Sequence, residues 1–421
     1  MQHPLRSGTP RRVAITGIGL IGPTGTGTQP FWQALIDQQA AIRRVSRFDP
    51  TSYPCQVAGE IPDQTYEELF EPRKKRSTSH VTQMGIAATE LALRDARAAT
   101  RSYAPERIGV SIGTALGGWR DGEQQHAILL ERGARRVNPF IANAAGNYGI
   151  AIEIAAMLNA QGPHATFCSG CPASLQAVGY AALLVASGRV DLCITGGSES
   201  PLSPLVFAGM CRTLELAPDN GVPEKASRPF DRGHCGIVLS EGACIIVVEP
   251  LELALERGAK VYAEVLGEAS SCDGAGIYSV DATGTAGARG MQHALSIAGV
   301  PAARIDYICS HANSSPMFDR KEALVLRAGL GAHASDVPIS SIKGVMGHPF
   351  GASGAFQVAA TSLAIQEGLI PPTTNLDDPD PECALQHVRG KPTRRDIHAA
   401  LITSYGYGGV NDFLVLGHPD R

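Results

Sequence analysis

The sequence predicts an α/β fold made of two similar halves, and two observations support this. Short apolar runs of strand type alternate with longer alanine- and leucine-rich runs of helix type. A small-residue turn, a helix and a further strand then recur in the second half of the chain. Such alternation is typical of parallel strands covered by helices. We therefore expect one half in residues 1–250 and a second in residues 251–421.

Each strand candidate is short and apolar and lies next to small residues or turns. In chain order, the candidates are RRVAITG, RIGVSIG and DLCITGG in the first half, and IDYICSH, VPISSIK and AALITSYG in the second. The helix candidates between them include LQAVGYAALLVASG and FQVAATSLAIQEG. The longest loop-like segment covers residues 214–235. Loops of that length in compact domains are often functional.

Composition limits the classes of protein that fit. The chain has 421 residues, 44% of them hydrophobic, and a formal net charge of -4. A large core is therefore expected, and nucleic acid is not expected as the main partner. The first twelve residues are polar and basic with no apolar stretch after them, so no signal peptide is predicted. The most apolar helical run, residues 150–158, contains Glu153 and is too short to cross a bilayer.

The 10 cysteines are scattered along the chain, and several lie inside strand-like runs. This distribution favours buried free thiols in a reducing cytoplasm over a disulfide framework. We therefore expect a cytoplasmic protein.

A glycine motif near the N-terminus resembles a nucleotide-binding fingerprint but lacks its context. Gly17, Gly19 and Gly22 spell GxGxxG after a strand-like run. In the fingerprint the last glycine opens a helix. Here PTGTGTQP follows, and the next helical segment begins only around Phe31. We interpret the motif as a turn between a strand and a loop.

The segment CSGC contains Cys168 and Cys171 and allows more than one interpretation. A zinc site is not favoured, because no second CxxC or HxxxH provides further ligands. Pro172 suits the first position of a helix, so Cys171 would lie where the helix dipole favours thiolate. Cys168 is then a small residue packed in the preceding turn. For Cys171 itself, a reactive thiol and a buried structural thiol remain equally open on spacing alone.

Two histidines follow strand-like runs in the second half. His311 ends IDYICS, and His348 precedes a helix in IKGVMGHPFGASGAF. Ligands of α/β sheets collect beyond the carboxyl ends of strands, so a site containing both histidines is plausible. Lys343 could bring positive charge to the same place. Packing histidines and a solvated surface lysine are the alternatives.

Taken together, these segments resemble the β-ketoacyl-acyl-carrier-protein synthases. The resemblance covers nearly the whole chain and rests on ordered signatures: GTALGGW, CPASLQAVG, GGSES, SRPFDRGHCGIVLSEGA, HANSSP followed by DRKEA, IKGVMGHPFGASGA, PPTTNLD and SYGYGGVND. It implies a dimer with a thiolase-like fold, a pseudo-duplicated five-layer αβαβα architecture. It also implies decarboxylative condensation of a malonyl thioester with an enzyme-bound acyl group, without metal or other cofactor.

The resemblance assigns roles to particular residues. The nucleophile falls on Cys171 rather than Cys168, and the two histidines and the lysine fall on His311, His348 and Lys343. The remaining assignments are Tyr405 for the gate and oxyanion hole, Leu116 for acyl-chain depth, and Asp319 and Glu322 for support of the His311 loop.

Several residues depart from the family pattern. The usual HGTxT is HANSS, with Ala312 in place of a glycine, and a common glutamate is Gln357. Cys235 replaces an acidic residue, and the gate is tyrosine rather than phenylalanine. These changes favour a specialised type II polyketide, polyene or fatty acid pathway over housekeeping fatty acid synthesis.

The expected partner is an acyl carrier protein. Its docking site is predicted at the basic run of Arg73, Lys74, Lys75 and Arg76. The assembly is expected to be a homodimer or a heterodimer with a homologous chain-length factor. Two other functions remain possible: a non-catalytic chain-length subunit, which usually lacks the cysteine, and a coenzyme A thiolase, which carries a second cysteine where this chain has SYGYGG.

Overall fold

The first half of the molecule forms one side of a large mixed β-sheet. The computed structural model describes residues 10–61, 66, 74–98, 100–213 and 215–420. The strands of the first half are β1 (Val13–Gly22), β5 (Ile108–Gly113), β6 (His164–Phe167), β7 (Leu192–Glu199) and β8 (Gly242–Pro250). They lie in the order β1-β8-β7-β5-β6, so that β6 is at the edge of the sheet.

The second half repeats this arrangement in mirror order. Its strands are β9 (Ala263–Cys272), β10 (Tyr307–Cys309), β11 (Ile339–Ser340), β14 (Ala399–Gly406) and β15 (Val410–Gly417). They lie in the order β9-β15-β14-β10-β11, and β9 pairs with β1 to join the halves. In each half the three strands nearest the centre of the sheet pair antiparallel, and the two strands beyond them pair in parallel. The predicted duplication is therefore confirmed.

The prediction of parallel strands is only partly right. β5 pairs in parallel with β6 and β7, and β10 with β11 and β14. β14 and β15 are antiparallel because they are joined by a tight turn in which Gly408 and Gly409 have positive φ angles. β11 is also shorter than the predicted VPISSIK strand, since Lys343 already begins a helix.

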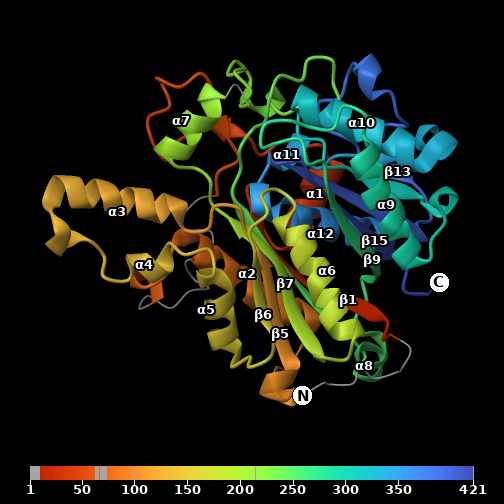
Figure 1. Ribbon diagram of the computed structural model, residues 1–421, viewed down its shortest axis with the longest axis horizontal. Helices are drawn as coiled ribbons and strands as arrows, with labels where there is room; N and C mark the ends of the chain where they lie inside the picture. Colours follow the sequence, from red (N-terminus) through yellow and green to blue (C-terminus); the bar gives the residue numbers. More distant parts are fainter. Residues whose placement is uncertain (1–9, 62–65, 67–73, 99, 214, 421) are drawn as a thin grey trace.

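Two long helices lie between the sheet halves, and others cover the outside (Figure 1). The helices are α1 (Thr28–Ile36), α2 (His80–Ala96), α3 (Trp119–Arg132), α4 (Ile141–Ala144), α5 (Gly149–Leu158), α6 (Ala173–Ala186), α7 (Pro204–Arg212), α8 (Leu251–Glu256), α9 (Thr285–Ala298), α10 (Pro316–Leu330), α11 (Lys343–Met346) and α12 (Ser353–Glu367). α6 and α12 match the two predicted helices and pack on each other. α2 and α5 cover the first half, and α9 and α10 cover the second, which completes the five-layer thiolase-like architecture.

Smaller elements decorate this frame. They are β2 (Gly25–Thr26) beside β1, the pair β3 (Arg43–Arg44) and β4 (Val57–Ala58), and the pair β12 (Leu369–Ile370) and β13 (Thr393–Arg394). α3 and α4 project from the first half as an arm, and α3 buries no residue (Figure 1). No helix among the described residues is long and apolar enough to cross a membrane.

The glycine motif serves packing rather than a turn. Gly17 and Gly19 lie inside β1. A Cβ added at Gly17 would lie only 2.4 Å from the Ala92 carbonyl oxygen, and one added at Gly19 only 2.1 Å from the Ala88 carbonyl oxygen. Both carbonyls belong to α2. The glycines therefore allow α2 to lie closely against β1, and the predicted strand-to-loop turn is wrong for these two positions.

Candidate active site

Cys171 lies where the chain passes from β6 to the buried helix α6. Gly170 has a φ of 78° and turns the chain, and its carbonyl accepts a hydrogen bond from Ala173 N at 3.1 Å. Cys171 is only 4% exposed, whereas Cys168 is exposed and hydrogen-bonded to Asn147 and the Ala115 carbonyl. The two thiols of CSGC thus have different environments, and the prediction that Cys168 is packed is wrong.

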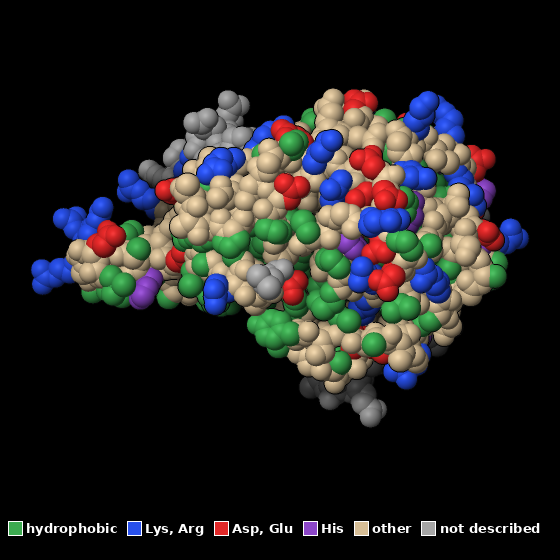
Figure 2. Space-filling model, turned by 90° about the horizontal axis from the view of Figure 1, so that it is seen from above, with side chains coloured by type: hydrophobic (Ala, Val, Ile, Leu, Met, Phe, Trp, Pro, Cys, Tyr) green, Lys and Arg blue, Asp and Glu red, His purple; other side chains and the backbone are tan. Residues whose placement is uncertain are grey.

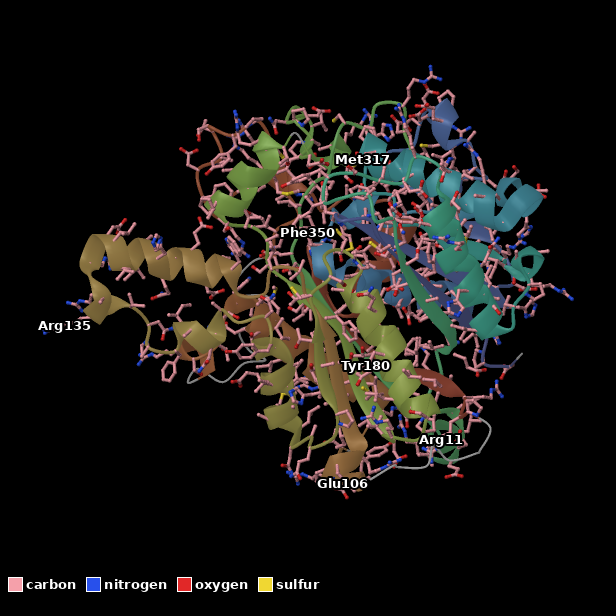
Figure 3. All side chains as sticks on the ribbon, viewed as in Figure 1. Arg11, Glu106, Arg135, Tyr180, Met317 and Phe350 are labelled. Atoms are coloured by element: carbon pink, nitrogen blue, oxygen red, sulfur yellow. The ribbon has the colours of Figure 1, made fainter. Side chains whose placement is uncertain are left out.

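The structure brings His348 and His311 to Cys171 from the other half. His348 Nε2 lies 3.2 Å from Cys171 Sγ. The ring centroids of His311 and His348 are 5.2 Å apart, with the ring planes almost perpendicular. Figure 3 shows Phe350, two residues after His348, in the middle of the molecule above the ends of the first-half strands. The predicted cluster of one thiol and two imidazoles is therefore assembled at the centre of the fold.

Backbone contacts hold His348 in place. Its N–H donates to the Val238 carbonyl at 2.8 Å, and its own carbonyl accepts from Ser240 N at 3.1 Å. Nδ1 of His348 and Nδ1 of His311 have no hydrogen-bond partner among the described residues. Buried polar atoms without partners are unusual in a packed interior, and a bound substrate can satisfy them.

Lys343 lies beside His311, and its charge also acts on His348. Its Nζ donates a hydrogen bond to the His311 carbonyl oxygen, and the residue is completely buried. Burial lowers the pKa of Lys343 to about 8, although the charge of Glu322 opposes this shift. The amine therefore loses its proton more readily than an exposed lysine.

Burial keeps the other members of the cluster neutral at rest. It lowers the pKa values of His311 and His348 well below their usual range, and Lys343 lowers them further. Burial also raises the pKa of the Cys171 thiol to about 12, while Lys343 acts in the opposite direction. The thiolate that the helix position predicts is thus not favoured at rest. Instead, a thiol faces an imidazole that can accept its proton.

A buried carboxylate shapes the loop that carries His311. Glu322 accepts hydrogen bonds from His311 N at 3.1 Å and from Ala312 N at 2.8 Å. The hydroxyls of Ser310 and Thr403 also donate to it. Burial raises the pKa of this carboxyl, and the hydroxyl and amide donors lower it.

Asp319 holds the next part of the same loop. Its carboxylate accepts from Asn313 N at 2.9 Å and from Phe230 N at 2.8 Å. Ala312 does not have a positive φ angle, so the loop needs no glycine there.

Gln357 uses its amide in a way that a glutamate cannot. Its Nε2 donates to the carbonyl oxygens of Cys309, Ser310 and Thr403 at 2.9–3.2 Å. Cys309 ends β10 and Ser310 follows it, whereas Thr403 lies inside β14. The amide therefore links α12 to both strands, whereas a carboxylate would face only acceptors.

The structure places Tyr405 deeper than its predicted role as a gate requires. It is fully buried within β14, where its ring packs on His311 and Phe413 at centroid distances of 5.7 and 5.9 Å. Tyr407, which the sequence analysis did not select, lies beyond the strand and is only partly buried. Its ring contacts Phe318 and Tyr278. Tyr407 is the better candidate for a gate, because it lies at the edge of the cluster.

Leu116 is part of the apolar surroundings of Cys171. It is half-buried and packs against an apolar group that includes Cys171, Phe207 and Phe350. Its backbone N–H donates a hydrogen bond to the Glu199 carboxylate, which also accepts one from Ala115 N. Its position agrees with a wall of an acyl pocket.

The basic run predicted for carrier-protein docking is only partly described by the structure. Arg73 is outside the described residues, and Lys74, Lys75 and Arg76 form one turn of 3₁₀ helix. Cys235 is exposed and is the last residue of the predicted long loop. In the part of the chain that the structure describes, no group of three or more His, Cys, Asp or Glu side chains is arranged to hold a metal ion.

A thiolase-like fold with one cysteine and two histidines at its centre is typical of enzymes that act on acyl thioesters. The comparisons with known proteins support this class. Residues 10–254 match the model of the β-ketoacyl synthase N-terminal domain, and residues 262–377 match that of the C-terminal domain. The chain belongs to the β-ketoacyl synthase family.

Individual relatives are similar over almost their whole length. The chain is 36% identical to 3-oxoacyl-[acyl-carrier-protein] synthase 2 of Synechocystis, over 95% of this chain and 96% of that protein. It resembles the structure of the ishigamide ketosynthase/chain length factor with a TM-score of 0.89 and 31% identity, over 97% of this chain and 99% of the other. A type II ketosynthase, AntDE, solved in complex with its acyl-carrier protein AntF, matches with a TM-score of 0.89 and 27% identity over the same shares.

Proposed function

We propose that the chain is a β-ketoacyl synthase that condenses an acyl group on Cys171 with a malonyl thioester of an acyl carrier protein. The observation that carries the proposal is the 3.2 Å contact between Cys171 Sγ and His348 Nε2, with His311 beside it. A non-catalytic chain-length subunit needs no acyl-accepting thiol, so this contact favours a catalytic chain. A coenzyme A thiolase is less favoured because residues 404–409 contain no cysteine.

The geometry supports a two-stage reaction. In the first stage Sγ attacks the acyl thioester and gives its proton to His348, and the carrier sulfur leaves with the bonding pair and takes this proton from His348. In the second stage the malonyl carboxylate leaves as carbon dioxide, and its electron pair forms an enolate next to His311, His348 and Lys343, where hydrogen-bond donors and the charge of the lysine stabilise it. The enolate carbon then attacks the acyl group, and Sγ leaves with the bonding pair.

The same proposal covers partners and location. The carrier protein is supported by the relatives whose names include it. A second chain, identical or of chain-length-factor type, is supported by the similarity to a ketosynthase/chain length factor and by the position of β6 at the sheet edge. Pathways of type II polyketide or fatty acid synthesis and a cytoplasmic location agree with these relatives.

Mass spectrometry after incubation with an acyl carrier-protein thioester tests the proposal. The acyl group is expected on Cys171, lost in Cys171→Ala and retained in Cys168→Ser, the matched control. Adding the malonyl carrier-protein thioester should then give a β-ketoacyl product. An acyl group found on Cys168, or no acylation of any cysteine, would contradict the proposal.

A further inference from the structure

Asn313 makes a side-chain contact with His311 that the assigned roles do not explain. The residue is only 1% exposed and lies in the segment between β10 and α10. Figure 3 labels Met317, the second residue of α10, which lies just after this segment. Asn313 Nδ2 is 3.2 Å from His311 Nε2, and Asn313 Oδ1 is 3.1 Å from Ser315 N. The usual family residue at this position is the threonine of HGTxT.

The direction of these hydrogen bonds is determined by chemistry. A backbone N–H only donates, so the atom facing Ser315 must be the amide oxygen, and the amide nitrogen must face His311. An amide nitrogen only donates, so His311 Nε2 must be the acceptor. Because the buried His311 is neutral at rest, its proton is then on Nδ1.

This tautomer changes which groups can stabilise an enolate. His311 Nε2 has no hydrogen to donate while Asn313 faces it, and His348 Nε2 faces Cys171 Sγ. Asn313 Nδ2 carries two hydrogens, and its contact with His311 is its only hydrogen bond among the described residues. The second hydrogen is therefore free for a ligand close to the His311 ring.

We propose that Asn313 is a catalytic residue that donates a hydrogen bond to the thioester carbonyl oxygen of the malonyl unit as that oxygen becomes the enolate oxygen. This inference rests on the proposed condensation and names a donor for its second stage. The bond between the malonyl carboxyl carbon and the α-carbon breaks, carbon dioxide leaves, and the electron pair moves into the enolate. No proton is transferred, so a neutral amide donor is sufficient.

The fixed position of Asn313 supports this role. Its backbone N–H is held by Asp319 and its Oδ1 by Ser315 N, so little rearrangement is needed to present Nδ2. A threonine hydroxyl both donates and accepts, and so it would not hold His311 in one tautomer. Asparagine in place of threonine thus gives His311 a neighbour that can only donate a hydrogen bond to it.

Three variants test the inference with two separate readouts. Asn313→Ala removes the donor, Asn313→Asp keeps the shape but replaces the donor with an acceptor, and Asn313→Thr restores the family residue. We expect release of carbon dioxide from a malonyl carrier-protein thioester to fall about 100-fold in the Ala and Asp variants. Acylation of Cys171 should change less than about twofold, because His348 and Cys171 are untouched.

The second readout is the tautomer of His311, measured by ¹⁵N NMR of histidine-labelled protein and assigned by comparison with His311→Ala. The proton should be on Nδ1 in the wild type and on Nε2 in Asn313→Asp. A wild-type proton on Nε2, or wild-type decarboxylation in Asn313→Ala, would overturn the inference. If Asn313→Ala does not fold, the isosteric Asp variant decides. If the wild type itself releases no carbon dioxide, the proposed function fails, and the tautomer still tests the arrangement.

Discussion

The two halves of the molecule use the same hydrogen-bond arrangement for different purposes. In the first half, the segment after β5 donates to Glu199 from the Thr114 hydroxyl and from Ala115 N and Leu116 N. In the second half, the segment after β10 donates to Glu322 from the Ser310 hydroxyl and from His311 N and Ala312 N. Ala115 and His311 therefore occupy corresponding positions. The duplicated frame fixes the backbone twice, and the side chain at that position decides whether the half provides an apolar wall or an imidazole.

The two carboxylates come from different elements. Glu199 ends β7, beside the segment it holds, whereas Glu322 lies in α10, which follows its segment. Glu199 also accepts Gly351 N at 3.1 Å, which connects it to the loop after His348. Glu199 thus links the wall of the first half to the histidine segment of the second.

The largest expected effect comes from changing each carboxylate to an amide. In Glu322→Gln the new NH₂ group would face donors, so the His311 loop should shift. We expect malonyl decarboxylation to fall roughly 100-fold while acylation of Cys171 is largely retained. Glu199→Gln should instead impair acylation and alter the preferred acyl-chain length, as measured with a series of acyl carrier-protein thioesters. Equal effects of both variants on both stages would contradict the division of labour between the halves.

The pH dependence of stability gives a second, smaller contrast. Burial raises the pKa of Glu199 to about 7, against the hydrogen bonds that lower it. In the unfolded chain a glutamate titrates near its ordinary value, so between these two pKa values the folded state binds more protons. Stability should therefore fall as pH rises, by about 2 kcal/mol between pH 5 and pH 7 from this group.

Denaturant unfolding of the wild type and Glu199→Gln across this range measures that contribution. The variant cannot titrate at this position and should lose stability less steeply with rising pH. Glu90→Gln should follow the wild type, since Glu90 is partly exposed and pairs with Arg94 on the surface of α2. Identical slopes for the wild type and Glu199→Gln would show that this carboxyl is ionised in the folded protein.

The sequence predicted the duplicated frame because strand and helix periodicity repeats locally in each half. It also distinguished Cys171 from Cys168, because helix-start signals lie within a few residues. It did not select Glu199, whose importance depends on three segments far apart in the chain. Tyr405 was assigned as the gate and Tyr407 was overlooked because the pattern does not show where β14 ends. Asn313 was overlooked because its function depends on the direction of two hydrogen bonds rather than on its residue type.

The smallest expected effect concerns the surface on which a carrier protein docks, which we place in the first half alone. Asn138 Nδ2 donates to the Arg76 carbonyl at 2.9 Å, which joins the predicted basic run to the arm that carries Arg135 and Arg136. Figure 2 shows Lys and Arg side chains gathered at the end of this arm. Acidic carrier proteins would be attracted to such a surface, and salt would screen the attraction.

Charge reversal at Arg76 and Arg135 should therefore raise the KM for the acyl carrier protein about three- to tenfold at low salt, with kcat nearly unchanged. The difference should shrink at high ionic strength, because exposed charges are screened over about 10 Å or less at 0.1 M salt and above. Arg304→Glu, an exposed change in the second half, is the matched control and should leave KM unaffected. Should Arg304→Glu weaken carrier use as much as the arm variants, docking would depend on overall charge rather than on the first half.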